Sequence, residues 1–159
     1  MPLNGSLEAS SIYLNLNTRP QAGTYHWGLT ITDSHMNAAL HHASNRNGPW
    51  MYEERIAKPD QSMSLIVLLL IGKVKNHARM MEVIKGMPAD GSPSQRTGEP
   101  FNCVTWAKDV LVSLHESGEI VLPGTIDEVE ITAVKNALKY APSAETGQGA
   151  TVIDINECS

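Results

Sequence analysis

Hydrophobic and polar residues alternate along short segments in the first half of the chain, as half-buried β-strands require. In Ser11 to Leu16 the alternate apolar residues share one face. In Tyr25 to Ile31 the side chains of Trp27, Leu29 and Ile31 share one face of the predicted strand. His26 and every second residue after it share the opposite face. Three further strands are predicted at Ala38 to Ala43, Trp50 to Ile56 and Ser64 to Val74.

The last of these segments contains an uninterrupted apolar run, Leu65 to Ile71. It is far shorter than the roughly 20 apolar residues that a membrane-spanning helix needs. We therefore expect it to be a buried central strand of a sheet.

The second half of the chain has helical patterns. Asn76 to Lys85 predicts a helix that Gly86 and Pro88 stop. From Cys103 the apolar residues follow a helical period, with Asn102 as a good N-cap and Gly118 suited to the end. Thr125-Ile126-Asp127-Glu128 is a capping box that opens another helix, whose apolar stripe consists of Ile126, Val129, Ala133, Ala137 and Tyr140.

Two segments have loop composition. Met87 to Pro100 is rich in proline, glycine and polar residues, which predicts a flexible loop that leads directly to Cys103. The tail from Pro142 is expected to be partly loose, with Thr151-Val152-Ile153 as a candidate edge strand. The length of 159 residues suits one domain with a real core, so we treat residues 1–159 as a single unit.

Composition and charge exclude several classes of protein. The net charge is −5 and Lys and Arg form no patch, so nucleic-acid binding is not expected. Met1 to Ser11 resembles neither a secretory signal nor a transit peptide, so we expect a cytoplasmic protein without a membrane span. Two cysteines cannot make a disulfide framework, and Cys158 is misplaced for prenylation.

The candidate chemistry is a thiol beside an imidazole. Cys103 lies at a predicted helix N-terminus, where the unpaired N–H groups and the helix dipole stabilise a thiolate. His26 is the candidate general base and acid. His41 is the natural third residue that orients His26, although a one-residue slip of register would bring His42 to that position instead.

Other site chemistries have weaker support. No paired-cysteine motif is present, and His41 and His42 diverge to opposite faces of a strand, so a zinc site is not favoured. No P-loop or dinucleotide fingerprint occurs, and we expect no cofactor. Glu53-Glu54 is interpreted as a solvated strand edge. Cys103 as a plain core residue and His26 as a satisfied strand residue stay open alternatives.

The order of these pieces resembles a known family. A strand that starts His26-Trp27-Gly28, a second with Leu40-His41-His42-Ala43 and then Asn102-Cys103 at a helix start are similar to the circularly permuted papain-like enzymes. Within that group, the NlpC-like enzymes and the lecithin:retinol acyltransferases look most similar. The resemblance implies an α+β fold, in which a small antiparallel sheet packs against the cysteine helix.

The same resemblance implies roles for the residues. Cys103 would be the nucleophile, His26 the general base and acid, and His41 the orienting third member. Val104-Thr105-Trp106 departs from the acyltransferases at the positions after the cysteine, and no apolar C-terminal anchor helix is present, so their lipid specificity is not carried over.

The functional expectation is therefore a thiol hydrolase or acyltransferase that forms an acyl-thioester intermediate with a peptide or other acyl substrate. Two alternatives stay open. One is a cyclase or rearrangement enzyme of specialised metabolism that uses His26 as a base on a small molecule. The other is a non-catalytic binding module with the same fold.

Overall fold

The structure is a computed structural model, and it describes residues 3–158. Six strands form one sheet in the order β4-β3-β2-β1-β5-β6. The strands are β1 (Ser11–Thr18), β2 (Tyr25–Thr32), β3 (Ala38–Ser44), β4 (Met51–Ile56), β5 (Leu65–Lys73) and β6 (Thr151–Asp154). The first five pair antiparallel, and β6 joins β5 in parallel at the edge. The α+β class and the mainly antiparallel sheet are thus confirmed.

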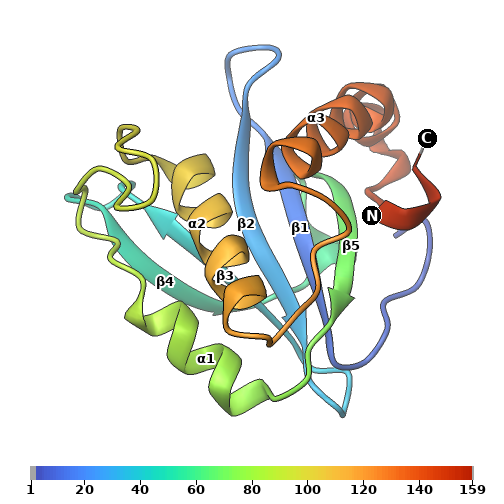
Figure 1. Cartoon of the computed structure of the whole chain (residues 1–159). Coiled ribbons are helices and arrows are strands. Elements are labelled where there is room, and N and C mark those ends of the chain that lie inside the picture. The colour runs from blue at the N-terminus through green and yellow to red at the C-terminus, as the bar shows by residue number, and fades with distance from the viewer. Residues whose placement is uncertain (1–2, 159) are drawn as a thin grey trace.

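Three α-helices cover one face of this sheet (Figure 1), namely α1 (His77–Gly86), α2 (Cys103–Glu116) and α3 (Ile126–Ser143). Helix α2 lies on β2 and β3, and α3 lies on β1 and β5. All three predicted helices form: α1 begins one residue after the expected Asn76, which caps it, and the predicted starts of α2 and α3 are confirmed. The Asn102 side chain caps α2 by accepting from the Thr105 amide, and the Thr125–Glu128 capping box opens α3.

The predicted strands all form, with ends that differ by one or two residues. Residues 87–102 contain no helix or strand, as their composition indicates. The segment from Pro142 onward, which we expected to be partly loose, instead completes α3, forms a π-helical turn (Ala144–Gln148) and then forms β6. The predicted edge strand is confirmed, because the parallel bonds to β5 hold it in place.

The hydrophobic core lies between the helices and the sheet. Trp27, Leu29 and Ile31 of β2 are all buried there against Leu111 and its neighbours on α2. A smaller apolar cluster on the other face joins β1 and β5 to the N-terminal segment and β6, through Tyr13, Leu65, Leu68, Leu70 and Ala150.

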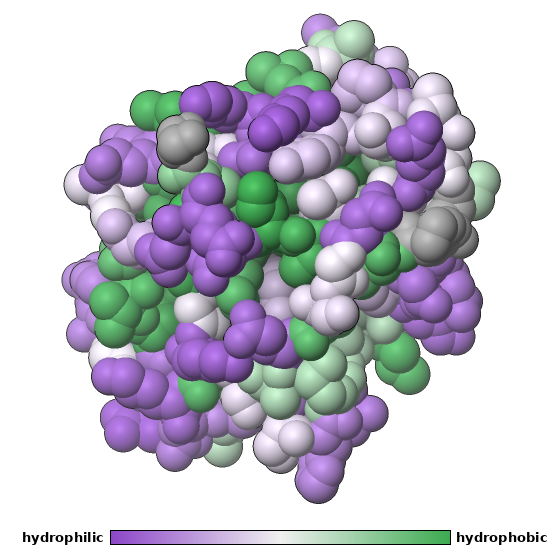
Figure 2. All heavy atoms as spheres, turned by 90° about the vertical axis from the view of Figure 1, so that its right-hand side faces the viewer, coloured by the Kyte–Doolittle hydropathy of each residue, from purple (hydrophilic) through white to green (hydrophobic). Residues whose placement is uncertain are grey.

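The outer surface is mixed. The side of the molecule that carries α3 and both chain ends shows small hydrophobic areas separated by polar ones (Figure 2). Ile131 and Leu138 of α3 are among the exposed apolar side chains. No helix in the described part of the chain is long and apolar enough to cross a membrane.

A matched pair of leucines tests this placement of the core. Leu111 is 0% exposed on α2, whereas Leu138 on α3 is 59% exposed. Leu111→Ala is expected to lower the free energy of unfolding by about 2–5 kcal/mol, because it removes buried methyl groups and leaves a cavity. Leu138→Ala should change it by less than about 0.5 kcal/mol. Urea denaturation measures both, and equal effects would contradict the assignment.

Candidate active site

Cys103 is the first residue of α2, at the end of the sheet where the β1–β2 loop lies. Its side chain is only 2% exposed, yet it lines a hollow of about 320 Å³ together with residues of that loop and of α3. Asn102 caps the helix with an N–O distance of 2.9 Å to Thr105 and leaves the other first-turn N–H groups around the thiol. The sulfur therefore lies in the positive potential of a helix N-terminus.

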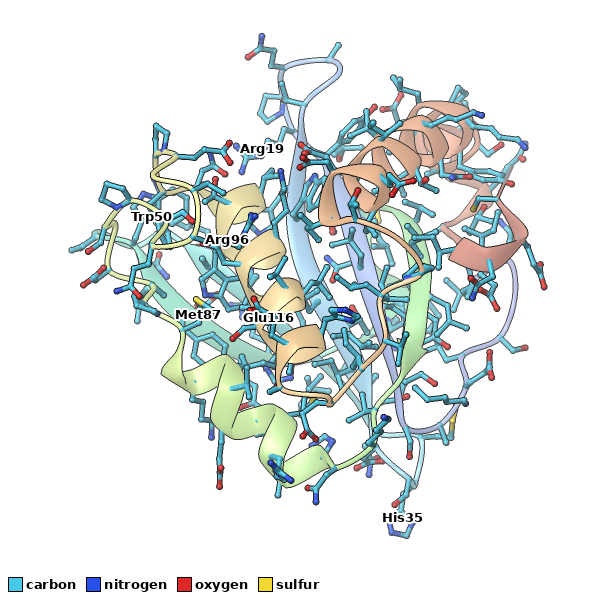
Figure 3. All side chains as sticks on the ribbon, viewed as in Figure 1. Arg19, His35, Trp50, Met87, Arg96 and Glu116 are labelled. Atoms are coloured by element: carbon cyan, nitrogen blue, oxygen red, sulfur yellow. The ribbon has the colours of Figure 1, made fainter. Side chains whose placement is uncertain are left out.

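Arg19, from the loop between β1 and β2, lies between the thiol and the first imidazole. Its Nη2 is 3.0 Å from Cys103 Sγ and 3.4 Å from His26 Nδ1. Figure 3 shows Arg19 at the N-terminal end of α2 and beside α3. The direct thiol–imidazole contact that the sequence led us to expect is thus replaced by two contacts to one guanidinium.

From His26 a row of hydrogen bonds crosses the sheet to its β4 edge. His26 Nε2 is 2.7 Å from His42 Nδ1, and His42 Nε2 is 2.7 Å from Glu53 Oε1. The two imidazole rings meet edge to face at 82°. Each member comes from a different strand, so the pairing of β2, β3 and β4 alone brings them together.

His42, and not His41, is the residue that contacts His26, so the expected contact from His41 is wrong. Thr32 pairs with Ala38 and Leu29 with His41, which places the side chain of His41 on the face of α2 with that of Leu29. His41 Nδ1 instead makes a 2.6 Å hydrogen bond with the Tyr52 hydroxyl, and Tyr52 in turn lies against the Trp106 ring. His26 points to the opposite face, where His42 is its diagonal neighbour.

That face is tightly packed beside the imidazoles. Gly28 follows His26 on the same side of β2, and a Cβ there would come within 3.0 Å of both Asn15 Nδ2 and Leu40 Cδ1. Thr30, next along, donates from its hydroxyl to Asn15 Oδ1 at 3.0 Å. This part of β2 therefore carries hydrogen-bonded polar side chains at His26 and at Thr30, with little space between them.

The acceptor at the end of the row sets the direction of every bond in it. An ionised carboxylate only accepts, so Glu53 requires the proton of His42 on Nε2. The bare Nδ1 of neutral His42 then accepts from Nε2–H of His26. This leaves a lone pair on His26 Nδ1, which faces the Arg19 guanidinium, and Arg19 can donate one Nη2 hydrogen to it and the other to Cys103 Sγ.

The charges agree with this assignment. Burial, with His42 and Arg19 nearby, lowers the pKa of His26 to about 4, and burial also lowers the pKa of His42 although Glu53 opposes the effect. The hydrogen bond from His42 lowers the pKa of Glu53, helped by Arg55 and Arg46. At neutral pH the row is therefore one carboxylate and two neutral imidazoles, with a free base at its inner end.

Sequence reasoning missed two members of this site. Arg19 lies in a loop 84 residues from Cys103 along the chain, and nothing in its local sequence indicates the contact. Glu53 was interpreted as a solvated edge residue, yet its side chain is only 22% exposed. A signal for Glu53 was present, because strand alternation puts it opposite His42 once β3 and β4 are in register.

Other candidate sites offer less chemistry. Within residues 3–158 no group of three or more His, Cys, Asp or Glu side chains has an arrangement that could hold a metal ion. A hollow of about 280 Å³ lies between α2 and the irregular segment, near Met87, Arg96 and Glu116 (Figure 3). It contains neither a thiol nor an imidazole.

Comparison with known proteins identifies the family. Residues 10–148, from the start of β1 to the end of the π-helical turn, match a family described as "Family of unknown function (DUF6914)". The chain belongs to this family. Searches of curated proteins and of solved structures find no match. The chemistry must therefore be argued from the site.

The direction of the hydrogen-bond row can be tested with Glu53→Gln. An amide both donates and accepts, so the side chain of glutamine no longer dictates which nitrogen of His42 is protonated. We expect His26 to change from one tautomer, protonated on Nε2, to a mixture. Long-range ¹H–¹⁵N correlation spectra distinguish the two forms. Glu54→Gln, one residue away on the other face, is the control, and a single unchanged His26 tautomer in Glu53→Gln would refute the assignment.

The lowered histidine pKa values also predict a pH dependence of stability. Burial lowers the pKa of His26 and of His41 to about 4, compared with about 6.5 in an unfolded chain. The unfolded state therefore binds protons first as pH falls, and stability that is complete above about pH 6.5 declines towards pH 4. Urea midpoints between pH 7.5 and 5, above the main carboxylate titration, should decrease. In His41→Gln the urea midpoint should fall less over the same pH range, because one buried imidazole is absent. A urea midpoint of the wild type that does not change with pH would contradict the prediction.

Proposed function

We propose that this protein is a cysteine-dependent acyl-transfer enzyme, either a hydrolase or an acyltransferase, with Cys103 as nucleophile. The observation that carries the proposal is that the Arg19 guanidinium contacts both the Cys103 thiol and the unprotonated Nδ1 of His26, whose ring is oriented by His42. A nucleophile, a base and a third group that holds the base in one tautomer are the parts that covalent acyl transfer requires.

The first step forms a thioester. The helix N-terminus and Arg19 place two sources of positive potential at Cys103, which stabilise negative charge on the sulfur as it develops during the reaction. Once Arg19 releases His26 Nδ1, the thiol proton passes to that nitrogen, and the sulfur forms a bond to the acyl carbon of the substrate. As the carbon–heteroatom bond breaks, the His26 imidazolium returns the proton to the leaving amine or alcohol.

The second step releases the acyl group. His26 Nδ1 removes a proton from water or from an acceptor amine or alcohol, which attacks the thioester carbon and restores the Cys103 sulfur. In both steps His26 carries a positive charge only briefly. His42 and the Glu53 carboxylate would stabilise that charge through the hydrogen-bond row, as the third member of a triad does.

The position of Arg19 assigns charge stabilisation and proton transfer to two different side chains. Because the guanidinium lies between Cys103 Sγ and His26 Nδ1, it can stabilise the thiolate while His26 acts on the leaving group and on the acceptor. The backbone N–H of Cys103 is one candidate donor to the oxyanion that develops on the acyl oxygen.

The resemblance to the circularly permuted papain-like enzymes supports this proposal. The imidazole strands precede the cysteine helix along the chain, and α2 begins with Asn102-Cys103 and packs on an antiparallel sheet. We propose the permuted papain-like architecture on this basis, with Cys103 and His26 in the roles that the resemblance implies. His42 replaces His41 as the proposed third member.

Thiol labelling tests the nucleophile. With iodoacetamide near neutral pH, we expect Cys103 to react at least about tenfold faster than Cys158, because positive potential surrounds only Cys103. Incubation with a panel of short acyl thioesters should add one acyl mass to the wild type but none to Cys103→Ser. Cys158→Ser is the matched control and should still acquire the adduct. Adducts on Cys158 alone would rule out the proposal.

The base and its support are tested by the turnover of the same adduct. His26→Ala should slow acylation by about 10²-fold or more, because it removes the proton acceptor. His42→Gln should slow acylation by roughly tenfold, because the tautomer of His26 is no longer set, whereas His41→Gln should change it by less than about threefold. Circular dichroism checks folding. A larger effect at His41 than at His42 would restore the original assignment.

A further inference from the structure

Arg19 has hydrogen-bond donors that the thiol and the imidazole do not use. Both of its contacts, to Cys103 Sγ and to His26 Nδ1, are made through Nη2. No carboxylate in the described part of the chain forms an ion pair with it, in contrast to Arg46, Arg55, Arg79 and Arg96. The Nη1 and Nε hydrogens of this exposed guanidinium therefore have no carboxylate partner, and either group can bind a carboxylate together with Nη2 once the Nη2 contact to His26 is released.

The hollow around Cys103 is charged in a way that suits an anion. Arg19 and Glu130 are its charged lining residues among those the structure describes. Lys108 Nζ lies 2.7 Å from Glu130 Oε1 and 3.3 Å from Asp127 Oδ1, so it offsets part of the negative charge of these two carboxylates. The positive potential next to the thiol comes from the guanidinium, which has no carboxylate partner among the described residues, and from the N-terminal end of the α2 dipole.

We propose that Arg19 selects acyl substrates that carry a carboxylate near the reacting carbonyl, such as short dicarboxylic acyl groups. This inference rests on the proposed function and specifies its substrate class. A planar guanidinium and a carboxylate match as a pair of parallel N–H···O bonds of about 2.8 Å. Because Arg19 Nη2 is 3.0 Å from the sulfur, a carboxylate bound to Nη2 and to one neighbouring nitrogen of Arg19 lies a few bonds from an acyl carbon on Cys103.

Substrate binding then also prepares the base. The Arg19–His26 contact is long at 3.4 Å, so two short bonds to a carboxylate outcompete it. When Arg19 turns to the carboxylate, the lone pair of His26 Nδ1 becomes available to a proton on the leaving group or on the acceptor. A neutral acyl substrate offers Arg19 no such partner.

The first test is independent of catalysis and compares iodoacetate with iodoacetamide, which differ only in a carboxylate and an amide. In both cases the sulfur forms a bond to the CH₂ carbon and iodide leaves. We expect the iodoacetate-to-iodoacetamide rate ratio to be at least about tenfold higher at Cys103 than at Cys158 in the same molecule. In Arg19→Gln this advantage should decline to about twofold, and Arg79→Gln, at an exposed arginine away from the site, should retain it.

Three outcomes would overturn the inference. They are equal ratios at the two cysteines of the wild type, an advantage that survives in Arg19→Gln, and failure of both reagents to label Cys103. The first two would show that Arg19 does not recognise the carboxylate. The third would show that the hollow does not admit even a two-carbon group. Circular dichroism of each variant controls for folding, and high salt should weaken a genuine advantage.

The second test separates this inference from the proposed function. Succinyl and succinamoyl thioesters have the same size and differ in charge, and intact mass measures acylation of Cys103. Faster transfer of the succinyl group, lost in Arg19→Gln, supports both ideas. Equal transfer of the two groups leaves acyl transfer standing and removes the role of Arg19. If neither acylates Cys103 while iodoacetate is preferred, an anion site exists without the proposed chemistry.

Discussion

The alternation of side chains along the antiparallel strands assigns every strand residue to one of two faces, and the two faces are filled differently. On one face, Trp27, Leu29 and Ile31 are buried beneath the helices and supply most of the hydrophobic driving force. On the other face, the neighbours of these residues in β2 make hydrogen bonds across the sheet. A strand that slipped by one residue would exchange the two sets, so the apolar face holds the polar face in register.

The hydrogen-bonded part of this second face, beside the apolar cluster on β1 and β5, is stable because its groups are satisfied without burying a net charge in the middle of the sheet. Both ring nitrogens of His42 have partners at 2.7 Å, and His26 has a partner at each nitrogen. The one carboxylate of the row is at the outer strand, where Arg46 lies 3.4 Å away and water has partial access. Burial keeps the imidazoles neutral, and Glu53 then decides which of their nitrogens carry protons.

Arg19 gives the site a character that a simple thiol–imidazole pair lacks. In such a pair the imidazolium stabilises the thiolate and so is committed to it. Here a permanent cation and a helix N-terminus surround Cys103, while His26 retains a lone pair at neutral pH. The cation is exposed and sits in a loop, which is where a side chain can exchange an internal contact for a bound group at low cost.

Local signals in the sequence determined most of the secondary structure. The alternation of apolar and polar residues in 25–32 predicts β2, and Asn102 and the Thr125–Glu128 capping box predict the starts of α2 and α3. These signals can be read from the sequence because each acts within a few residues of the chain. The sequence also indicated Cys103 and His26 as the candidate thiol and base, which the structure links through Arg19. The tertiary structure decided which neighbours they have. The choice of His42 over His41 depends on the five residues between β2 and β3, whose number sets the hairpin register. Arg19 and Glu53 join the site through contacts between distant segments, and no local pattern encodes such contacts because packing of the whole sheet and helix layer creates them.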